Sequence, residues 1–559
     1  MSVSKIVECV PNFSEGRDKG VIDAISQAIS GVAGVKVLDV DPGADTNRTV
    51  YTFAGPPEPV LEAALAAARK ARDLIDMRNH SGAHPRMGAL DVCPFVPVSG
   101  VSMEECAELS KSLGRRLAEE LGVPVYLYES AASRPERRSL ADIRAGEYEA
   151  LPEKLRNPEW TPDFGPAVFD PRWGATVVGA REFLIAYNVN LNTRDRKLAH
   201  EIALNIREGG RALKGPDGSS LRDAQGNLVK TPGRLHHVRA IGWYIDSYRR
   251  AQVSINLTDY HATPLHVVFE TVREEAENLG LRVTGSEVVG LLPLEPLVEA
   301  GRYYLRKAGK SGGAPEAELL ETAVQSLGLD SVAPFESGKK VVEYAVRSAG
   351  PLVSRTVASF TDEVSADSPA PGGGSVAALA GSLGAALAAM VANLTVGKKG
   401  YEAAWKDLDA LALGAQEVKA RLMAAVDEDT NAFNDVLSAQ KLPKGTEEEK
   451  KTRAAAIQEG YRSATRVPLA TARACLDAVR VSESAAEMGN RASVTDAGVG
   501  ALLAAAGAEG AVLNVLINLG SIEDAEWAAK IREEAEALAA EARAVRDRTL
   551  LKVREAMGG

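Results

Sequence analysis

The chain has 559 residues, of which 45% are hydrophobic and 25% are charged, and its net charge is −11. At roughly 150 residues per domain, this length predicts about three or four globular domains rather than one core. The acidic balance argues against nucleic acid or an anionic membrane as a partner, so an anionic ligand needs a local basic cluster.

The first part of the chain alternates strands and helices in the order β-α-β-β-α-β, the split pattern of a ferredoxin-like unit. We expect strands over 6–13, 35–41, 48–55 and 90–98, and helices over 19–29 and 57–77. A further helix over 102–121 and a strand over 123–128 extend this unit.

The same order then recurs without detectable sequence identity between the two halves. We expect strands over 183–191, 235–245, 252–259 and 282–292, and helices over 197–207 and 264–279. Residues 208–233 are rich in Gly, Asp and Lys and predict a mobile surface loop. Two α/β sandwiches in tandem leave a groove between them, a favoured place for a small-molecule site.

Beyond about Arg355 the composition becomes rich in Ala and Leu, with helical periodicity up to Met557. Such a change predicts a separate helical bundle. The predicted architecture is therefore multi-domain. It has a pair of ferredoxin-like α/β sandwich subdomains over 1–180 and 181–330, a linker over 331–355 and an all-α domain over 356–559.

Three features bear on localisation. Four cysteines are scattered without a CxxC motif, which favours reduced thiols in a cytoplasmic protein; they are Cys9, Cys93, Cys106 and Cys475. The first residues contain no apolar h-region, so no signal peptide is expected. The stretch from Val376 to Gly397 carries no charge, and its length would suit a membrane span. Its mostly Ala and Gly composition favours a buried bundle helix instead.

Two histidines, His80 and His84, lie in the short connection between the second predicted helix and the following strand. Imidazole can take and return a proton near neutrality. The H-x3-H spacing can also place two metal ligands on one helix face, but Gly82 and Pro85 disfavour a helix here. We favour proton transfer by one of the two histidines over a metal site; a solvated loop histidine without a role is the alternative.

Asp41 ends a predicted strand, just before Pro42-Gly43. A carboxylate at a strand end can orient an imidazole or an incoming nitrogen. It can equally cap the turn that follows, and the sequence leaves both interpretations open.

A third candidate segment combines two glycines, two prolines, Phe169 and Trp173. Such a segment can bring backbone amides and an aromatic plane against a flat heterocycle, or it can simply connect two domains. Its residues are Gly165, Pro166, Ala167, Val168, Phe169, Asp170, Pro171, Arg172, Trp173 and Gly174.

In the helical part, Asp429 continues an apolar stripe that runs through Leu422 and Ala425. An ionised carboxylate on a core face is costly, so a proton-transfer role with a raised pKa is one interpretation and a structural polar contact is the other. The glycine-rich helix start before Ser375 is a weak anion-binding signal or merely a cap. Asn514 and Asn518 are inward-facing amides that could recognise a heterocycle.

These motifs resemble the bifunctional formimidoyltransferase-cyclodeaminase family over nearly the whole chain. The resemblance rests on strings such as VECVPNFSEG at 7–16, HPRMGALDVCPF at 84–95 and APGGGSV at 370–376. Further matching strings lie at 38–41, 46–53, 144–151, 241–244, 442–444 and 514–519.

The resemblance implies two reactions of histidine degradation and one-carbon metabolism. The first part would transfer a formimino group from N-formimino-L-glutamate to tetrahydrofolate. The helical part would close the product to 5,10-methenyltetrahydrofolate and release ammonia. The family's transferase histidine falls on His84, which resolves the choice over His80, and its cyclodeaminase aspartate falls on Asp429. Asp41 would hold the His84 tautomer or the folate amine.

The family's folate-contacting segment falls on 165–174, with a further contact at Gly233, although this chain is longer than expected between Gly209 and Pro232. Tetrahydrofolate would be a co-substrate, and neither a metal nor a redox cofactor is called for. Lys398 and Lys399 could attract polyglutamate tails or belong to a solvated helix end. The resemblance also implies a homo-oligomer, a ring-like octamer.

Two rival functions remain. One is a glutamate formyltransferase fused to a methenyltetrahydrofolate cyclohydrolase, which would share the folate site. The other is a folate-binding or scaffold protein without activity. The presence of His84 and Asp429 in their full motifs argues against the second.

Overall fold

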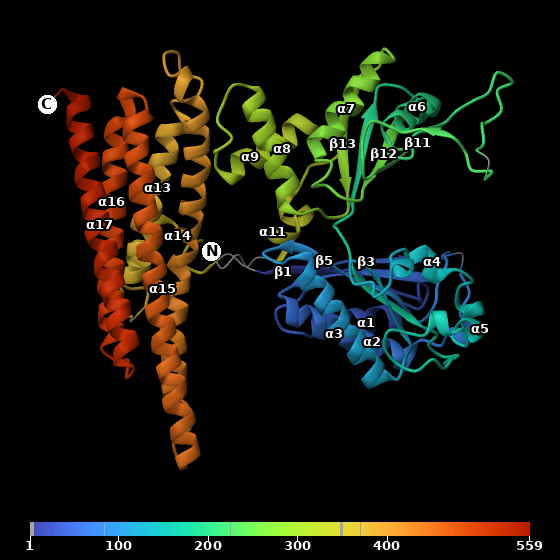
Figure 1. Cartoon of the computed structure of the whole chain (residues 1–559), viewed down its shortest axis with the longest axis horizontal. Helices are drawn as coiled ribbons and strands as arrows, with labels where there is room; N and C mark the ends of the chain where they lie inside the picture. The colour runs from blue at the N-terminus through green and yellow to red at the C-terminus, as the bar shows by residue number, and fades with distance from the viewer. Residues whose placement is uncertain (1–4, 83, 224, 347–349, 369, 559) are drawn as a thin grey trace. The chain divides into compact units, whose positions relative to one another are not determined.

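The computed structural model describes residues 5–82, 84–223, 225–346, 350–368 and 370–558. These residues form two compact units (Figure 1). The α/β unit comprises residues 5–297 and 327–346, and the helical unit comprises residues 298–326 and 350–558. The predicted layout, α/β domains followed by a helical region, is confirmed.

The first sheet of the α/β unit contains β1 to β7, in the order β3-β4-(β1, β2)-β5-β7-β6. Strands β1 to β5 pair antiparallel, whereas β5, β7 and β6 run parallel. The elements are β1 (Ile6–Cys9), β2 (Asn12–Phe13), α1 (Lys19–Ser30), β3 (Lys36–Gly43), β4 (Arg48–Gly55), α2 (Pro57–Leu74), β5 (Leu90–Ser99), α3 (Met103–Leu121), β6 (Val125–Glu129) and β7 (Thr176–Ala180).

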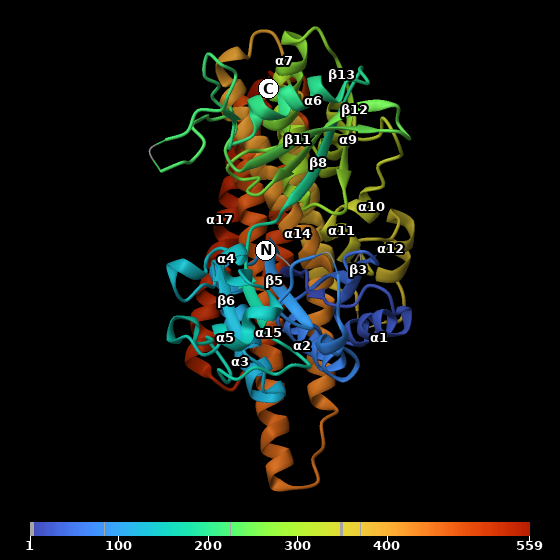
Figure 2. The ribbon, with the colours of Figure 1, turned by 90° about the vertical axis from the view of Figure 1, so that its right-hand side faces the viewer.

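Strand β4 shows why this sheet has one covered and one open face. Tyr51 and Phe53 are fully buried, and the Tyr51 hydroxyl donates to the carbonyl oxygen of Ile22 in α1. Helices α1, α2 and α3 cover this face of the sheet (Figure 2). Because neighbouring residues of a strand alternate between faces, Arg48 and Thr52 point to the open face.

Short helical turns occupy the connections around β5, β6 and β7. They are η1 (Met77–Asn79), η2 (Pro135–Arg137), α4 (Leu140–Arg144), η3 (Tyr148–Ala150), α5 (Leu151–Lys154) and η4 (Pro158–Trp160). The predicted strand over 6–13 is split into β1 and β2, because Pro11 has no N–H to donate to a neighbouring strand.

The second sheet is antiparallel, with the strand order β11-β12-β8-β13. Helices α6 and α7 pack on one face, as the predicted repeat of architecture requires. Its elements are β8 (Ile185–Leu191), α6 (Arg196–Ile206), β9 (Arg211–Ala212), β10 (Lys230–Thr231), β11 (Val238–Ile245), β12 (Arg250–Leu257), α7 (Leu265–Asn278) and β13 (Val283–Val289).

The segment 208–233, predicted as a mobile surface loop, contains regular strand pairing. Its ends pair as the two-stranded sheet of β9 and β10. Further bridges join Lys214 to Ser220 and Arg222 to Leu228. The segment is therefore a hairpin extension of the second sheet (Figure 1), although its Gly and Asp residues suggested only turns.

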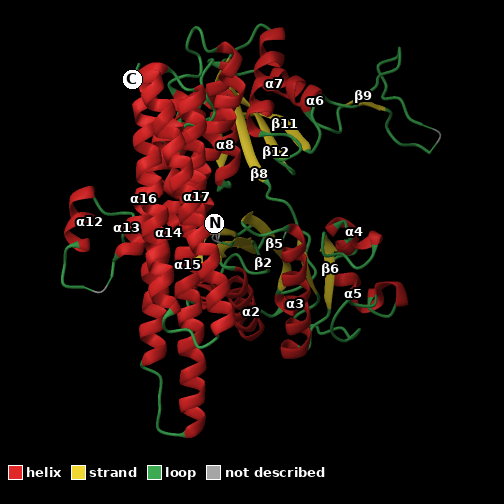
Figure 3. Cartoon of the chain, turned by 60° about the vertical axis from the view of Figure 1, so that its left-hand side comes forward, coloured by secondary structure: helices red, strands yellow, loops and turns green. Residues whose placement is uncertain are grey.

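The helical unit is built on the long helices α13 to α17, each antiparallel to the next (Figure 3). Its core is rich in alanine, and α13 and α16 pack closely because both are dominated by Ala and Gly. The remaining elements of the chain are α8 (Leu294–Lys307), α9 (Glu316–Leu327), α10 (Ser337–Lys340), α11 (Val342–Val346), α12 (Val357–Val364), α13 (Gly373–Asn393), η5 (Glu402–Ala404), α14 (Trp405–Gln440), α15 (Glu447–Met488), η6 (Arg491–Ser493), α16 (Val494–Leu519) and α17 (Ala525–Met557).

Two helices of the described chain, Gly373–Asn393 and Arg491–Leu519, are long and apolar enough to span a membrane by length and composition. Their most apolar windows are 61% and 50% buried. A core helix passes the same test, and both helices pack against α15 of the bundle. The uncharged stretch beginning at Val376 is therefore the buried bundle helix α13, as predicted.

Candidate active sites

The loop that carries His84 is held close to the first sheet by two glycines. A Cβ built on Gly82 would lie 2.1 Å from the carbonyl oxygen of Thr46, in the turn between β3 and β4. A Cβ built on Gly88 would lie 2.4 Å from the carbonyl oxygen of Ala175. Only residues without a side chain permit both approaches, so the loop is fixed on either side of His84.

His84 is half-buried and contacts a cation. Nη1 of Arg48 lies 2.7 Å from Nε2 of His84. A guanidinium can only donate, so Nε2 must be the acceptor and the imidazole is neutral, with its proton on Nδ1. Burial, reinforced by the positive charge of Arg48, lowers the pKa of His84 below its usual range. His84 is therefore poised as a base at neutral pH.

His80 differs from His84 because both of its ring nitrogens are occupied by protein groups. Nε2 lies 2.8 Å from the carbonyl oxygen of Asn47, and Nδ1 accepts from Nε of Arg86 at 3.3 Å. This arrangement ties the loop to the sheet. In His84, by contrast, Nε2 contacts a side chain, that of Arg48, which could move to make room for a substrate.

Two further charged residues lie next to His84 and Arg48. Asp91 is buried, accepts from the backbone N–H of Met87 at 2.8 Å and forms an ion pair with Arg144. Burial raises the pKa of Asp91, although Arg144 opposes this effect. The cluster thus combines two guanidinium groups and one carboxylate in a chain of net charge −11.

Asp41 lies on β3, paired in register with Val50 of β4. Its side chain is exposed, and its charge acts on Arg48. Among the described residues it makes no hydrogen bond to either histidine. The structure thus places Asp41 beside the cation that contacts His84, rather than on the imidazole.

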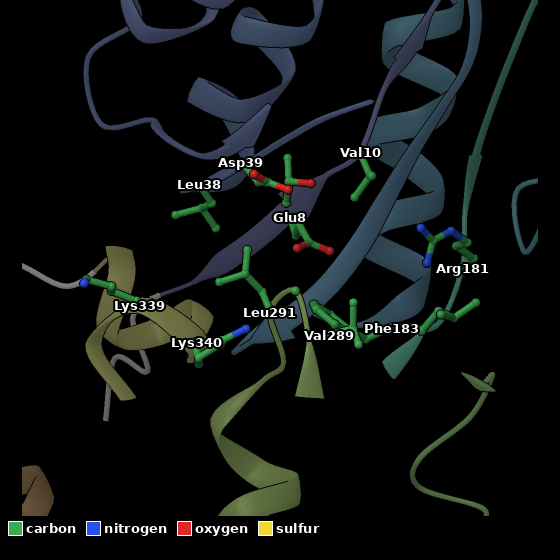
Figure 4. Close-up of a pocket in the computed structure, with 13 residues that line it drawn as sticks. Glu8, Val10, Leu38, Asp39, Arg181, Phe183, Val289, Leu291, Lys339 and Lys340 are labelled. Atoms are coloured by element: carbon green, nitrogen blue, oxygen red, sulfur yellow. The ribbon is translucent and has the colours of Figure 1, made fainter. Parts of the chain in front are cut away.

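A cavity of about 390 Å³ lies between the open face of the first sheet and the segment that follows β13 (Figure 4). Glu8, Asp39 and Thr52 line its wall on the first sheet, and Arg181 and Lys340 add positive charge. Burial raises the pKa of Glu8 to about 7. Thr52 and Arg48 share one face of β4, so the cavity and the His84 cluster lie along the same surface.

The segment 165–174 is anchored to both ends of the His84 loop. The N–H of Met77 donates to the carbonyl oxygen of Arg172 at 3.1 Å, and the N–H of Ala89 donates to that of Trp173 at 2.8 Å. Trp173 is fully buried, so its ring belongs to the core and offers no plane to a ligand. The ring of Phe169 packs 5.4 Å from that of Tyr148.

Gly233 lies in the second subdomain. A Cβ built on it would lie 2.1 Å from the carbonyl oxygen of Arg207. Among the described residues no hydrogen bond joins it to 165–174, so the structure does not bring these two candidate folate contacts together directly.

The second candidate site lies in the helical unit, where Asp429 of α14 meets the first turn of α13. The hydroxyl of Ser375 donates to Oδ2 of Asp429 at 3.4 Å and to the carbonyl oxygen of Val426 at 2.8 Å. Burial raises the pKa of Asp429, and hydrogen bonds from Ser375 oppose the shift. The carboxyl is thus held towards its neutral form, as a proton donor requires.

The two candidate amides of α16 differ in what they contact. A Cβ built on Gly373 would lie 3.4 Å from Nδ2 of Asn514, so Asn514 borders the same helix start as Asp429. Asn518 donates instead to the carbonyl oxygen of Ala464 at 2.7 Å and joins α16 to α15. Lys398 donates to Oδ1 of Asn490 at 3.3 Å.

Sequence reasoning missed Arg48, Arg144, Asp91 and Glu8 as site residues. All four lie within the strings that carry the family resemblance, but composition alone did not distinguish them from ordinary surface and core residues. The alternation along 48–55 places Arg48 on the open face and was the available signal. Among the described residues, no group of three His, Cys, Asp or Glu side chains could hold a metal ion.

The α/β unit thus carries a neutral imidazole and the helical unit a desolvated carboxyl, the kinds of group that enzymes of acid–base chemistry use. Family models match both units. The model described as "Formiminotransferase domain, N-terminal subdomain" matches residues 6–181. "Formiminotransferase domain" matches residues 186–347, and "Formiminotransferase-cyclodeaminase" matches residues 356–537.

The chain is 50% identical to the formimidoyltransferase-cyclodeaminase of Rattus norvegicus over 97% of each chain. It is 41% identical to the glutamate formimidoyltransferase of Streptococcus pyogenes over 54% of this chain and 94% of that protein. It is 42% identical to the methenyltetrahydrofolate cyclohydrolase of Methylorubrum extorquens over 35% of this chain and 94% of that protein. The chain belongs to the formimidoyltransferase-cyclodeaminase family.

Proposed function

We propose that this chain is a bifunctional folate enzyme of histidine degradation and one-carbon metabolism. It transfers the formimino group of N-formimino-L-glutamate to tetrahydrofolate and then converts 5-formiminotetrahydrofolate to 5,10-methenyltetrahydrofolate plus ammonia. The observation that carries the proposal is the pairing of a neutral His84 in one unit with a desolvated Asp429 in the other.

In the transfer step, N5 of tetrahydrofolate attacks the formimino carbon and must lose its proton. The bond from that carbon to the glutamate nitrogen then breaks, and this nitrogen must gain a proton. His84 performs both tasks, first as base and then as acid, because a neutral imidazole can accept a proton and return it. Asp41 and Asp91 act on the charge around it through Arg48 and Arg144.

In the ring-closure step, N10 attacks the same carbon, and ammonia leaves once its nitrogen is protonated. A carboxylic acid whose pKa is raised by burial supplies that proton, and we assign this role to Asp429. Asn514, which borders the same helix start, is positioned to hold the pterin or its substituent.

We propose that tetrahydrofolate, the co-substrate of the transfer step, lies along the open face of the first sheet. The exposed residues 165–168 and the cavity lined by Glu8 and Arg181 flank this face. Gly233 is a further proposed contact, from the second subdomain. No additional cofactor enters the proposed chemistry.

We also propose the finer architecture. The strand orders β3-β4-β1-β5 and β11-β12-β8-β13, each with helices on one face, support two ferredoxin-like subdomains over 1–180 and 181–330. A linker over 331–355 and an all-α domain over 356–559 complete the proposed division. Residues 298–326 group by their contacts with the helical unit, and residues 327–346 with the α/β unit. Leu513 and Ile517 are 67% and 75% exposed on α16, and such an apolar face supports a homo-oligomer. We also propose a cytoplasmic protein, because its four cysteines are buried free thiols.

Two variants test the two sites separately. His84→Ala is expected to abolish transfer but to spare ring closure of supplied 5-formiminotetrahydrofolate. Asp429→Ala is expected to do the reverse. Both reactions are measured on the full-length chain. Absorbance reports the formation of methenyltetrahydrofolate, and a separate assay reports the release of ammonia. Loss of both activities in either folded variant would contradict two separable sites.

The cyclohydrolase relative supports one alternative, a formyl donor combined with hydrolytic chemistry on methenyltetrahydrofolate. N-formyl-L-glutamate carries no nitrogen that could leave as ammonia. Stoichiometric ammonia from N-formimino-L-glutamate and tetrahydrofolate therefore supports the proposed function. Turnover of the formyl compound without ammonia supports the alternative.

A further inference from the structure

The contact between Arg48 and His84 has a direct chemical consequence. Nε2 of His84 accepts a hydrogen bond from Nη1 of Arg48 at 2.7 Å. The lone pair that would take a proton from a substrate is therefore occupied. For His84 to act as a base through Nε2, the guanidinium must first find another acceptor.

The described residues around Arg48 offer its guanidinium no such second acceptor. Among the described residues Arg48 makes no ion pair, whereas its neighbour Arg144 is paired with buried Asp91. Burial lowers the pKa of Arg48, and repulsion from Arg144 adds to this effect. Asp41 and Asp91 attract Arg48 but do not hydrogen-bond to it, so among the described residues its guanidinium has no direct carboxylate partner.

Nε of Arg144 supplies a second observation. It is buried and has no hydrogen-bond partner among the described residues. A buried, charged donor without a partner is costly, and an anion at this point would satisfy it. The two arginines therefore form a half-buried site for a carboxylate beside the catalytic base.

We infer that Arg48 is the receptor for the α-carboxylate of N-formimino-L-glutamate, and that binding of this carboxylate withdraws Arg48 from His84 and frees Nε2 as the base. The inference rests on the proposed function and names how its first site recognises the donor. In formiminoglutamate the α-carboxylate is attached to the carbon that bears the reacting nitrogen. A carboxylate on Arg48 therefore places this nitrogen next to His84.

The proton balance follows directly. The freed Nε2 takes the proton of folate N5 as the bond from N5 to the formimino carbon forms. The bond from that carbon to the α-nitrogen then breaks, and Nε2 returns the same proton to that nitrogen. Glutamate leaves with its carboxylate, and Arg48 goes back to Nε2. The base is thus uncovered only while the donor is bound.

The first test compares Arg48→Gln with Arg48→Lys in the full-length enzyme. Arg48→Gln is expected to raise the KM for formiminoglutamate and the inhibition constant of glutamate at least tenfold, and to change the KM for tetrahydrofolate less than twofold. Arg48→Lys is expected to be intermediate, because an ammonium keeps the charge but loses the two-pronged contact. Arg69→Gln, which removes an exposed arginine paired with Glu120, is the control and should leave all three constants unchanged.

A substrate analogue identifies the carboxylate. The wild-type enzyme is expected to use the α-amide of formiminoglutamate at least tenfold less efficiently than the parent compound, and Arg48→Gln should lose this discrimination. If the γ-amide is discriminated through Arg48 instead, the α-carboxylate assignment is wrong. If wild-type transfer is normal and Arg48→Gln binds formiminoglutamate unchanged, the inference fails while the proposed function stands. Absence of transfer in the wild type would instead overturn the proposed function.

The pH profile separates a positioning role from a merely structural one. Besides burial, the charges of Arg48 and Arg144 lower the pKa of His84, and the charge of Asp91 raises it. Removing the Arg48 charge should therefore move the acidic limb of kcat/KM to higher pH. A structural defect would lower the whole profile without displacing that limb, and such a result would overturn the inference.

Discussion

The carboxylate of Asp429 lies against the backbone of Gly374, with no room for a side chain between them. A Cβ built on Gly374 would lie 2.1 Å from Oδ1 of Asp429. The first turn of α13 can therefore approach the carboxylate only because position 374 is glycine. The glycine-rich helix start and the aspartate, 55 positions apart in the chain, form one structural element.

Gly374→Ala is therefore expected to displace Asp429 or the start of α13. We expect ring closure to fall at least roughly tenfold, and the free energy of unfolding to fall by about 1–3 kcal/mol, the usual effect of overpacking. Transfer in the α/β unit should be unchanged. Steady-state assays of the two reactions and thermal denaturation check these results.

Gly414→Ala is the matched control for this substitution. Gly414 lies in α14, and a Cβ built on it would meet no atom within 4 Å. Alanine at this position should leave ring closure unchanged and stabilise the helix by up to about 1 kcal/mol. Equal activity in the Gly374 and Gly414 variants would show that the contact with Asp429 is unimportant.

The pH dependence of ring closure should report on the Asp429 carboxyl. Burial raises its pKa above the ordinary 3.8, and the proposed acid acts in its protonated form. Activity on supplied 5-formiminotetrahydrofolate should therefore fall as pH rises through the raised pKa, and Asp429→Asn should remove this limb together with most of the activity.

The same shift predicts an effect on stability. When a carboxyl has a higher pKa in the folded protein than in the unfolded chain, the protein loses stability as pH rises from the lower pKa to the higher one. In this range the unfolded chain releases the proton and the folded protein retains it. Asp429→Asn should abolish that loss. If the unfolding free energies of variant and wild type keep a constant difference over this pH range, Asp429 is not desolvated.

Much of this fold follows from local patterns. The β-α-β-β-α-β order and the change to Ala-rich helices predicted both units, and the stripe through Leu422 and Ala425 singled out Asp429. Both of these stripe residues are buried. The hydrophobic period and the composition of a segment depend only on residues that are close in the chain, so they can be determined from the sequence alone.

The contacts between distant segments could not be predicted in this way. Arg48 and His84 lie 36 positions apart, and their pairing depends on how one loop crosses a sheet. From the sequence, Trp173 could either offer its ring to a flat ligand or belong to a simple connection between two domains. It is buried in the core instead, since no local pattern says which side of a loop points inward.

His80→Gln should separate the roles of the two histidines in the transferase loop. Both nitrogens of His80 are bonded within the protein, to Asn47 and Arg86. We expect a loss of about 1–2 kcal/mol in unfolding free energy from these hydrogen bonds, with the acidic limb of the transfer rate unmoved. The pH dependence of kcat/KM and chemical denaturation provide the measurements. Displacement of the limb would instead assign proton transfer to His80.

Asp409 should matter for stability rather than chemistry, because it attaches the connection between α8 and α9 to α14. Its Oδ1 accepts from the backbone N–H of Gly312 at 2.6 Å and from the hydroxyl of Ser311 at 3.2 Å, and its Oδ2 accepts from Arg306 at 2.8 Å. Asp409→Ala leaves a part-buried N–H unpaired, which costs about 1–3 kcal/mol.

The expected result of Asp409→Ala is faster amide exchange in α8 and the α8–α9 connection, with an unfolding free energy lower by that amount. Asp407→Ala, two residues earlier in the same helix and exposed, is the matched control, because residues two apart face different sides of a helix. Asp407 lies in the first turn of α14, near the positive helix end, so its removal should cost at most about 1 kcal/mol. If α8 exchanges its amide hydrogens equally fast in both variants, the hydrogen bonds of Asp409 do not hold α8 in place. Packing alone would then hold it against the bundle.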